Sequence, residues 1–225
     1  MGIFAAFRAL NETRKTLKKS AKEEDALRAL PMAEFLPRWA GLLSGATGGG
    51  PVFHKAAAHA DLDLAEQRLG WPLPPELREF YLNANGIDWP MEGYRKNLPS
   101  ASEIRLSSAY VPALSAQLLD SWQSWGRDEG EPKGIKVFST SLLDLMADRY
   151  ECVIPFSEVD GMLSLDAPES GDGAVLVVNS NRHFPIGTVL EVENLTATRY
   201  DGIRQWLASG TGTIAGISAL ANRAA

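Results

Sequence analysis

The chain has 225 residues, of which 45% are hydrophobic and 22% are charged, a composition that excludes a disordered or fibrous protein and predicts a globular one. Its 22 lysines and arginines are outnumbered by 28 aspartates and glutamates, and the net charge of −6 argues against direct binding of nucleic acid. A single cysteine, Cys152, excludes an internal disulfide and a cysteine-based zinc site, which is typical of a reducing compartment. We therefore expect a cytoplasmic protein.

The first thirty residues differ in charge from the rest of the chain. They carry seven basic and four acidic side chains, a local charge of +3, so the remaining residues carry −9. Apolar residues recur there at helical spacing and predict an amphipathic helix: Ile3, Phe7, Leu10 and Leu17. The apolar run 3–7 is shorter than the ~7–15 residues of a signal-peptide core. Packing on its own domain is favoured over binding to a membrane surface, because any surface helix shows such a stripe.

A second helix is predicted over residues 32–43, where Phe35, Trp39 and Leu43 share one face. The glycine-rich stretch 44–51 then predicts a linker, because consecutive glycines lose too much conformational entropy to stay helical. We therefore expect an N-terminal helical extension over residues 1–46.

Two short helices joined by a proline corner are predicted next. The first covers 62–70 and ends in a glycine cap at Gly70. The prolines of 71–75 cannot continue that helix but can begin the next one. The second helix carries apolar residues at i, i+3, i+4 and i+7, namely Leu77, Phe80, Tyr81 and Ala84. Asn85-Gly86 then supplies a left-handed stop.

Beyond the corner, periodicity predicts another helix over residues 111–125. The pattern changes to that of strands after Arg149. The apolar run 151–156 and the alternating run 162–166 predict an antiparallel pair joined by a turn at Asp160-Gly161.

The last third of the chain predicts two more strands and a closing helix. The strands are expected at 174–178, which is apolar enough to be buried on both faces, and at 189–192. Thr198 and Asp201 have the spacing of a capping box, which predicts a helix with a buried stripe of Ile203, Trp206 and Leu207. This order of elements predicts an α+β fold, with helices packed around a small, mainly antiparallel sheet.

Three stretches of the sequence together resemble a known family. Residues 64–86 run through a helix, a Leu-Gly, a Leu-Pro corner and an amphipathic helix that ends in Asn-Gly. Residues 160–166, Asp-Gly-Met-Leu-Ser-Leu-Asp, look like a central hairpin, and 200–207, Tyr-Asp-Gly-Ile-Arg-Gln-Trp-Leu, look like a closing helix. In this order they resemble the SUKH superfamily. The resemblance implies a SUKH-like domain over 60–208, followed by a C-terminal tail over 209–225.

The resemblance implies a protein-binding function without catalysis and without a cofactor. Bacterial SUKH members are widely immunity proteins, which bind and neutralise a cognate toxin, such as a nuclease or deaminase, delivered in bacterial competition. Fungal members look like scaffolds in the control of cell-wall synthesis. The acidic body favours the first role, because a nuclease toxin presents a basic cleft that a negatively charged partner can approach and cover. A regulatory scaffold in cell-envelope or cell-wall synthesis is the alternative.

No catalytic or metal site is predicted. Cys152 lies in an apolar, strand-like run, where a thiol is usually inert packing. His183 sits in a polar loop without a recognisable acid or nucleophile motif. His54 and His59 are five residues apart, which places them on different helix faces and argues against a shared metal. An unrecognised hydrolase is the third hypothesis, and it would need Cys152 or His183.

Exposed aromatic and acidic residues in loops are the expected anchors for a partner. Buried aromatic contacts dominate protein interfaces, and acidic side chains select for basic clefts. The candidates are Asp88, Trp89, Tyr94, Asp160, Glu169 and Asp172. Trp89 fits a core position equally well.

Overall fold

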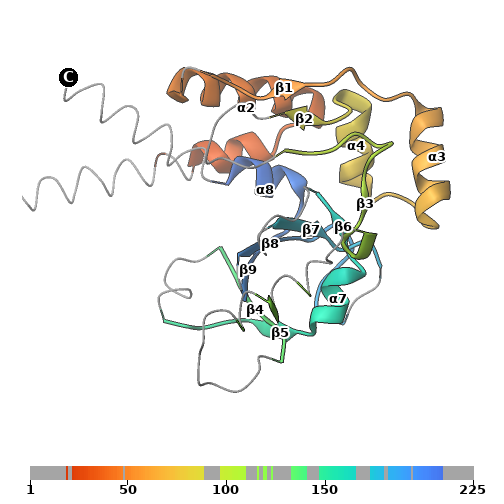
Figure 1. The fold of residues 1–225 in the computed structure, drawn as a ribbon. Helices are drawn as coiled ribbons and strands as arrows, with labels where there is room; N and C mark the ends of the chain where they lie inside the picture. Colours follow the sequence, from red (N-terminus) through yellow and green to blue (C-terminus); the bar gives the residue numbers. More distant parts are fainter. Residues whose placement is uncertain are drawn as a thin grey trace, which may run out of the picture. The chain divides into compact units, whose positions relative to one another are not determined.

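In the computed structural model, drawn as a ribbon in Figure 1, the chain has two compact units. One unit comprises residues 1–52, 89–95 and 207–225, and the other comprises 53–88 and 96–206. The residues that the structure describes are 19, 22–47, 49–88, 97–109, 116, 119–120, 123, 133–140, 147–165, 173–179, 182–193 and 195–209.

In the first unit, helix α2 spans Met32–Thr47 and buries the apolar stripe that the sequence predicts. Phe35 and Trp39, four residues apart and therefore on the same face, stack with ring centroids 6.1 Å apart and planes 10° from parallel. The helix runs through Ser44, so the linker predicted from residue 44 begins too early. The amphipathic helix predicted over residues 3–17 lies outside the described residues.

The second unit begins with the predicted helix–proline–helix corner, which is confirmed. Helix α3 spans His59–Leu69 and ends at Gly70, whose φ of 85° is the left-handed conformation of a glycine cap. Helix α4 spans Pro75–Asn83, with a proline in its first turn. Its predicted apolar face is fully buried, namely Leu77, Phe80, Tyr81 and Ala84. The backbone turns back through Gly86, whose φ is 116°.

A seven-stranded sheet forms the centre of the second unit. Its strands are β3 (Arg105–Leu106), β4 (Ile135–Phe138), β5 (Cys152–Ile154), β6 (Leu163–Ser164), β7 (Gly173–Leu176), β8 (Val189–Glu193) and β9 (Thr196–Tyr200). They lie in the order β3-β6-β7-β8-β9-β4-β5, and all neighbours are antiparallel except β4 and β9, which are parallel. The described residues also form a two-stranded sheet of β1 (Val52–Phe53) and β2 (Ile87–Asp88), η1 (Ser107–Ala109), α7 (Phe156–Asp160) and α8 (Ile203–Ala208). The predicted α+β class is confirmed.

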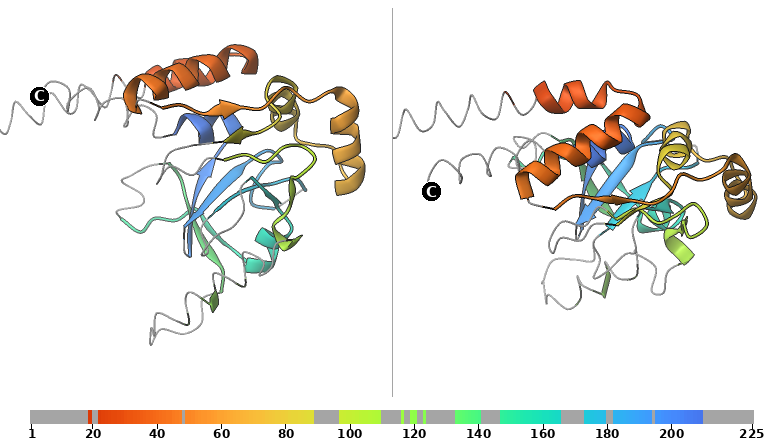
Figure 2. Two further views of the ribbon diagram at one scale, coloured as in Figure 1. Left: turned by 45° about the horizontal axis from the view of Figure 1, so that its top comes forward. Right: turned by 90° about the horizontal axis from the view of Figure 1, so that it is seen from above.

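Alternate strand residues face opposite sides of the sheet, and each side packs against a different helix. Val159 of α7 belongs to one apolar cluster with Val175 and Leu190. On the other side, Trp206 of α8 donates from Nε1 to the carboxylate of Glu191, the neighbour of Leu190 on β8 (3.3 Å). Helix α7 and the start of α8 therefore lie on opposite faces of the sheet, as Figure 2 shows.

The hairpin predicted at Asp160-Gly161 is wrong. Asp160 ends α7, and the amide of Met162 donates to the carbonyl of Val159 (3.0 Å) in a helical turn. Neither Asp160 nor Gly161 has a positive φ, which a type I′ turn requires at both central residues and a type II′ turn at the first. Strands β5 and β6 accordingly do not pair with each other: β5 pairs with β4, and β6 pairs with β3 and β7.

The capping box predicted at Thr198 is also wrong, because Thr198 lies inside β9. This strand pairs with β8 on one side and with β4 on the other. Its backbone N–H and C=O groups therefore form hydrogen bonds within the sheet and do not begin a helix. The closing helix begins at Ile203 instead. Its predicted buried stripe of Ile203, Trp206 and Leu207 is confirmed.

Candidate partner-binding surface

The carboxylate of Glu76 joins the beginning of the second unit to its end. It accepts hydrogen bonds from the backbone amide of Ile203 (2.7 Å) and from Nε of Arg204 (2.6 Å). A Cβ atom on Gly202 would lie 2.1 Å from Oε2 of Glu76, so only glycine leaves room for this contact. Glu76 on α4 therefore provides the N-terminal cap of α8, with a negative charge at the positive end of the helix dipole.

Arg68 holds the turn that leads into β3. Its guanidinium donates to the backbone carbonyls of Ala101 (2.9 Å) and Ile104 (2.8 Å), and also to that of Ser102. These carbonyls lie outside regular structure, where an unpaired buried carbonyl would be destabilising. Arg68 and Glu76, two charged residues of the corner, thus stabilise the fold through bonds to distant segments.

Asp88, a predicted partner-binding residue, forms an ion pair at the end of β2. Its Oδ2 lies 2.8 Å from Nε2 of His54, although the two residues are 34 positions apart. The hydrogen bond to Asp88 is the largest of the effects that raise the pKa of His54 above its usual value, and burial opposes it. His54 lies between β1 and α3 and not in a helix, so the predicted placement of His54 and His59 on two helix faces is wrong. The spacing of His54 and Asp88 in the sequence gives no signal that their side chains form an ion pair.

Asp160, the second predicted residue that the structure describes, is the last residue of α7. Figure 1 places β2 and α7 at opposite ends of the second unit, so Asp88 and Asp160 do not form one cluster. The other predicted partner residues lie outside the described residues: Trp89, Tyr94, Glu169 and Asp172.

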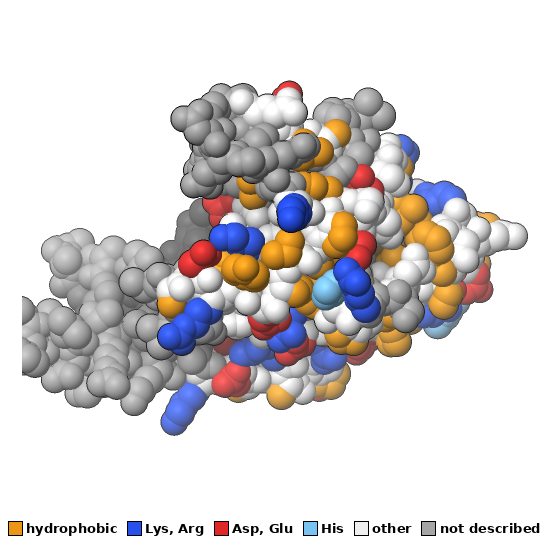
Figure 3. All heavy atoms as spheres, turned by 90° about the horizontal axis from the view of Figure 1, so that it is seen from below, with side chains coloured by type: hydrophobic (Ala, Val, Ile, Leu, Met, Phe, Trp, Pro, Cys, Tyr) orange, Lys and Arg blue, Asp and Glu red, His pale blue; other side chains and the backbone are white. Residues whose placement is uncertain are grey.

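A hollow of about 270 Å³ opens beside α7. It is lined by Ser157, Glu158, Gly161, Met162, Val177, Val178, Asn179 and Arg182. The apolar lining residues are buried, whereas most of the polar ones are exposed, so the hollow has an apolar floor and a polar rim. On this side of the molecule acidic and basic side chains are mixed with apolar ones (Figure 3). Sequence reasoning selected Asp160 but missed the hollow next to it.

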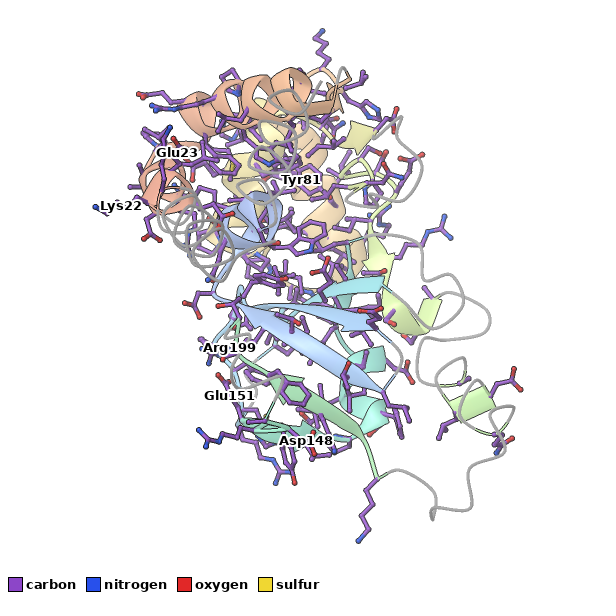
Figure 4. All side chains as sticks on the ribbon, turned by 90° about the vertical axis from the view of Figure 1, so that its left-hand side faces the viewer. Lys22, Glu23, Tyr81, Asp148, Glu151 and Arg199 are labelled. Atoms are coloured by element: carbon purple, nitrogen blue, oxygen red, sulfur yellow. The ribbon has the colours of Figure 1, made fainter. Side chains whose placement is uncertain are left out.

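A second group of charged residues lies where β4, β5 and β9 meet. Nζ of Lys136 is 3.1 Å from Oδ2 of Asp148 and 5.3 Å from the ring centroid of Tyr150, which is 46% exposed. Arg199 forms an ion pair with Glu151 at 3.2 Å. Figure 4 shows Arg199 of β9 and, below it, Glu151 and Asp148, which come shortly before β5 in the chain. Arg199 also lies 3.6 Å from Asp201, so both basic side chains of this group are paired with acidic ones.

The sequence model of the SMI1 / KNR4 family (SUKH-1) matches residues 56–208, well over half of the chain. The chain belongs to the SMI1 / KNR4 family (SUKH-1). No curated protein matches it. The family region contains both helices of the corner, the whole seven-stranded sheet and α8. In this SUKH-1 protein the contact between Glu76 and α8 therefore ties the first family motif to the last.

Members of the SUKH family are in general binding proteins without catalytic activity. In this SUKH-1 chain, burial raises the pKa of the Cys152 thiol, the reverse of what a nucleophilic cysteine needs. Within the described ranges, no three histidine, cysteine or carboxylate side chains gather as metal ligands. Among the described helices none has the length and apolar character needed to cross a membrane.

Proposed function

We propose that this SUKH-1 protein is an immunity protein, which neutralises a cognate bacterial toxin by binding it stoichiometrically. Membership of the SMI1 / KNR4 family carries this proposal, because the family consists in general of binding proteins. The raised pKa of Cys152 disfavours a nucleophilic thiol. Glu76 and Arg68 stabilise the fold through hydrogen bonds to distant backbone groups. Both observations support a protein that binds a partner.

The charge of the chain favours a toxin that acts on nucleic acid. Outside the first thirty residues the chain carries −9, and a nuclease must present a basic cleft to its substrate. Opposite charges accelerate the encounter and orient the partners, and this acceleration weakens as salt is added. An acidic protein that covers a basic cleft excludes the nucleic acid by the same interaction that the substrate would use.

Among the predicted partner-binding residues that the structure describes, Asp160 is the one on the helix beside the hollow. Asp160 is the last residue of α7, and its neighbours Glu158 and Gly161 line the hollow beside that helix. We therefore propose that the toxin contacts the α7 side of the second unit. The aromatic residues Trp89 and Tyr94 and the acids Glu169 and Asp172 are further proposed contacts.

Co-expression with the product of the adjacent gene tests this function. We expect growth of a bacterial host to be arrested by that product alone and restored by the immunity protein, with a one-to-one complex on size-exclusion chromatography with light scattering. The association rate should fall about tenfold or more between 50 and 500 mM salt. If the adjacent product is not toxic, or if toxicity persists without complex formation, the proposed function is contradicted.

A further inference from the structure

We propose that His54 is a pH-dependent switch, which holds the entry segment, residues 51–56, against β2 while its imidazole is protonated and releases this segment locally when the proton is lost. The entry segment leads from α2 into the second unit, which begins at Phe53. The family region begins at the last residue of the entry segment. The switch therefore lies where the N-terminal extension joins the family domain, and it acts whichever partner the protein binds.

Both the backbone and the side chain of His54 contact the segment that contains β2. The backbone amide donates to the carbonyl of Gly86 (3.2 Å), and Nε2 lies 2.8 Å from Oδ2 of Asp88. Nδ1 lies beside Gly86, where a Cβ atom would come within 2.9 Å of it. Gly86, whose φ of 116° is also unfavourable for other residues, therefore leaves room for the imidazole ring.

The surroundings of the imidazole ring fit its protonated form. The hydrogen bond to Asp88 has the largest effect on the pKa of His54 and raises it, and a hydrogen bond to the backbone of Asn85 raises it as well. A hydrogen bond raises the pKa of an imidazole when the ring donates it, so the ring faces two acceptors. Only the imidazolium carries a proton on both nitrogens and can donate to both. Loss of the proton therefore removes a hydrogen bond and the attraction to Asp88.

Within the described part of the chain, the charged groups that act on His54 are both acidic. Asp88 lies on β2, and Glu103 lies in the turn before β3. Burial of the ring opposes them, but the pKa of His54 is raised above its ordinary value of 6.5. The ion pair is therefore formed at low pH, and it is lost as pH rises through the pKa of the folded protein.

The entry segment has little buried surface, so its release is local. None of residues 51–56 is fully buried, and Val52 is 54% exposed. A sheet of two strands, such as β1 and β2, is only marginally stable in water. The chain is anchored again at Ala57, which is 8% exposed and whose amide donates to the carbonyl of Tyr81 (2.9 Å). Segments with few buried contacts open without unfolding of the whole protein.

Amide exchange of the full chain, labelled with ¹⁵N and followed by NMR, tests the switch. We expect the protection factor of the His54 amide to fall about threefold between about pH 5 and about pH 8, the size of effect that an exposed ion pair supplies. The fall should follow the titration of the His54 ring protons. The amides of Ala57 and Ala84, which donate to Tyr81 and Phe80, are the controls and should not follow it. A constant protection factor at His54, or an equal fall at all three amides, overturns the proposal.

Two substitutions separate the ion pair from the other acid near the ring. Asp88→Asn removes the charge at the same side-chain size, so the fall at the His54 amide should shrink below about twofold. Glu103→Gln removes the acid with the smallest effect on His54, so the fall should stay at about threefold. An unchanged fall in Asp88→Asn, or its loss in Glu103→Gln with the amide spectrum otherwise preserved, refutes the switch.

Discussion

The helix corner of α3 and α4 and the hollow beside α7 use charged residues in opposite ways. In the corner, Arg68 donates to three backbone carbonyls, and Glu76 accepts from two backbone amides at the start of α8. Beside α7, Glu158 and Arg182 line an open hollow over an apolar floor. The corner is the part that most resembles the family, so the most recognisable residues of this chain build the fold. The residues proposed to meet a partner lie outside that motif.

Of the substitutions considered, Glu76→Ala should lower the free energy of unfolding most. The substitution removes the cap of α8, together with the carboxylate that accepts from the amide of Ile203 and from Nε of Arg204. We expect the free energy of unfolding to fall by about 2–3 kcal/mol. Urea unfolding followed by tryptophan fluorescence measures it, with Glu193→Ala as an exposed control that should change less than about 0.5 kcal/mol. Equal losses in both variants would show that the cap is not a stabilising contact.

Gly202→Ala tests the same contact from the other side. The added methyl group would lie 2.1 Å from Oε2 of Glu76, so the carboxylate must move, at a cost of about 1–2 kcal/mol. In a chain that already carries Glu76→Ala the same change should cost almost nothing. A double-mutant cycle with urea unfolding therefore gives a coupling energy of about 1 kcal/mol or more. Strict additivity would place the effect of Gly202 elsewhere.

Glu158→Gln and Arg182→Gln sharpen the comparison, because they should leave stability unchanged. Both side chains line a surface hollow, and surface substitutions usually alter the free energy of unfolding by less than about 0.5 kcal/mol. The same urea experiment provides the measurement. A loss above about 1 kcal/mol in either variant would make α7 a structural region like the corner.

The smallest expected effect concerns pH and the pair of His54 and Asp88. The pKa of His54 is raised in the folded protein, so its contribution to stability is complete below its unfolded pKa and is lost as pH rises through its folded pKa. Asp88→Asn should lower the pKa of His54 toward 6.5, the ordinary value. An NMR titration of the His54 ring protons checks this. A pKa that does not move would show that Asp88 is not its main partner.

Local periodicity was sufficient for α2, α3 and α4, whereas α7 lies where the sequence predicted a hairpin turn. The buried face of α4 and the glycine cap of α3 follow from short-range patterns, and both are present as predicted. Residues 116, 119, 120 and 123 are helical, which agrees with the helix predicted over 111–125, the rest of which lies outside the described residues.

The sheet was harder to predict from the sequence than the helices, because its contacts join residues that are distant in the chain. No prediction covered β4, in which Lys136, Val137 and Phe138 pair with β9. Thr198 and Asp201 had the right spacing for a capping box, but the carboxylate that caps α8 belongs to Glu76, 127 positions before Ile203. The same holds for the candidate site. Asp160 could be selected as an acidic residue, whereas a hollow lined by residues from two separate segments has no signature in either of them.

The parallel pairing of β4 with β9 has a consequence for how the chain folds. Lys136 lies opposite Thr196, so about sixty residues separate the paired positions. Closing so long a loop is entropically costly, and contacts of this kind form slowly. During synthesis, β4 and β5 emerge well before β9, and two strands alone are only marginally stable in water. The hairpin of β4 and β5 must therefore wait for almost the entire family region to leave the ribosome before it has a sheet to join.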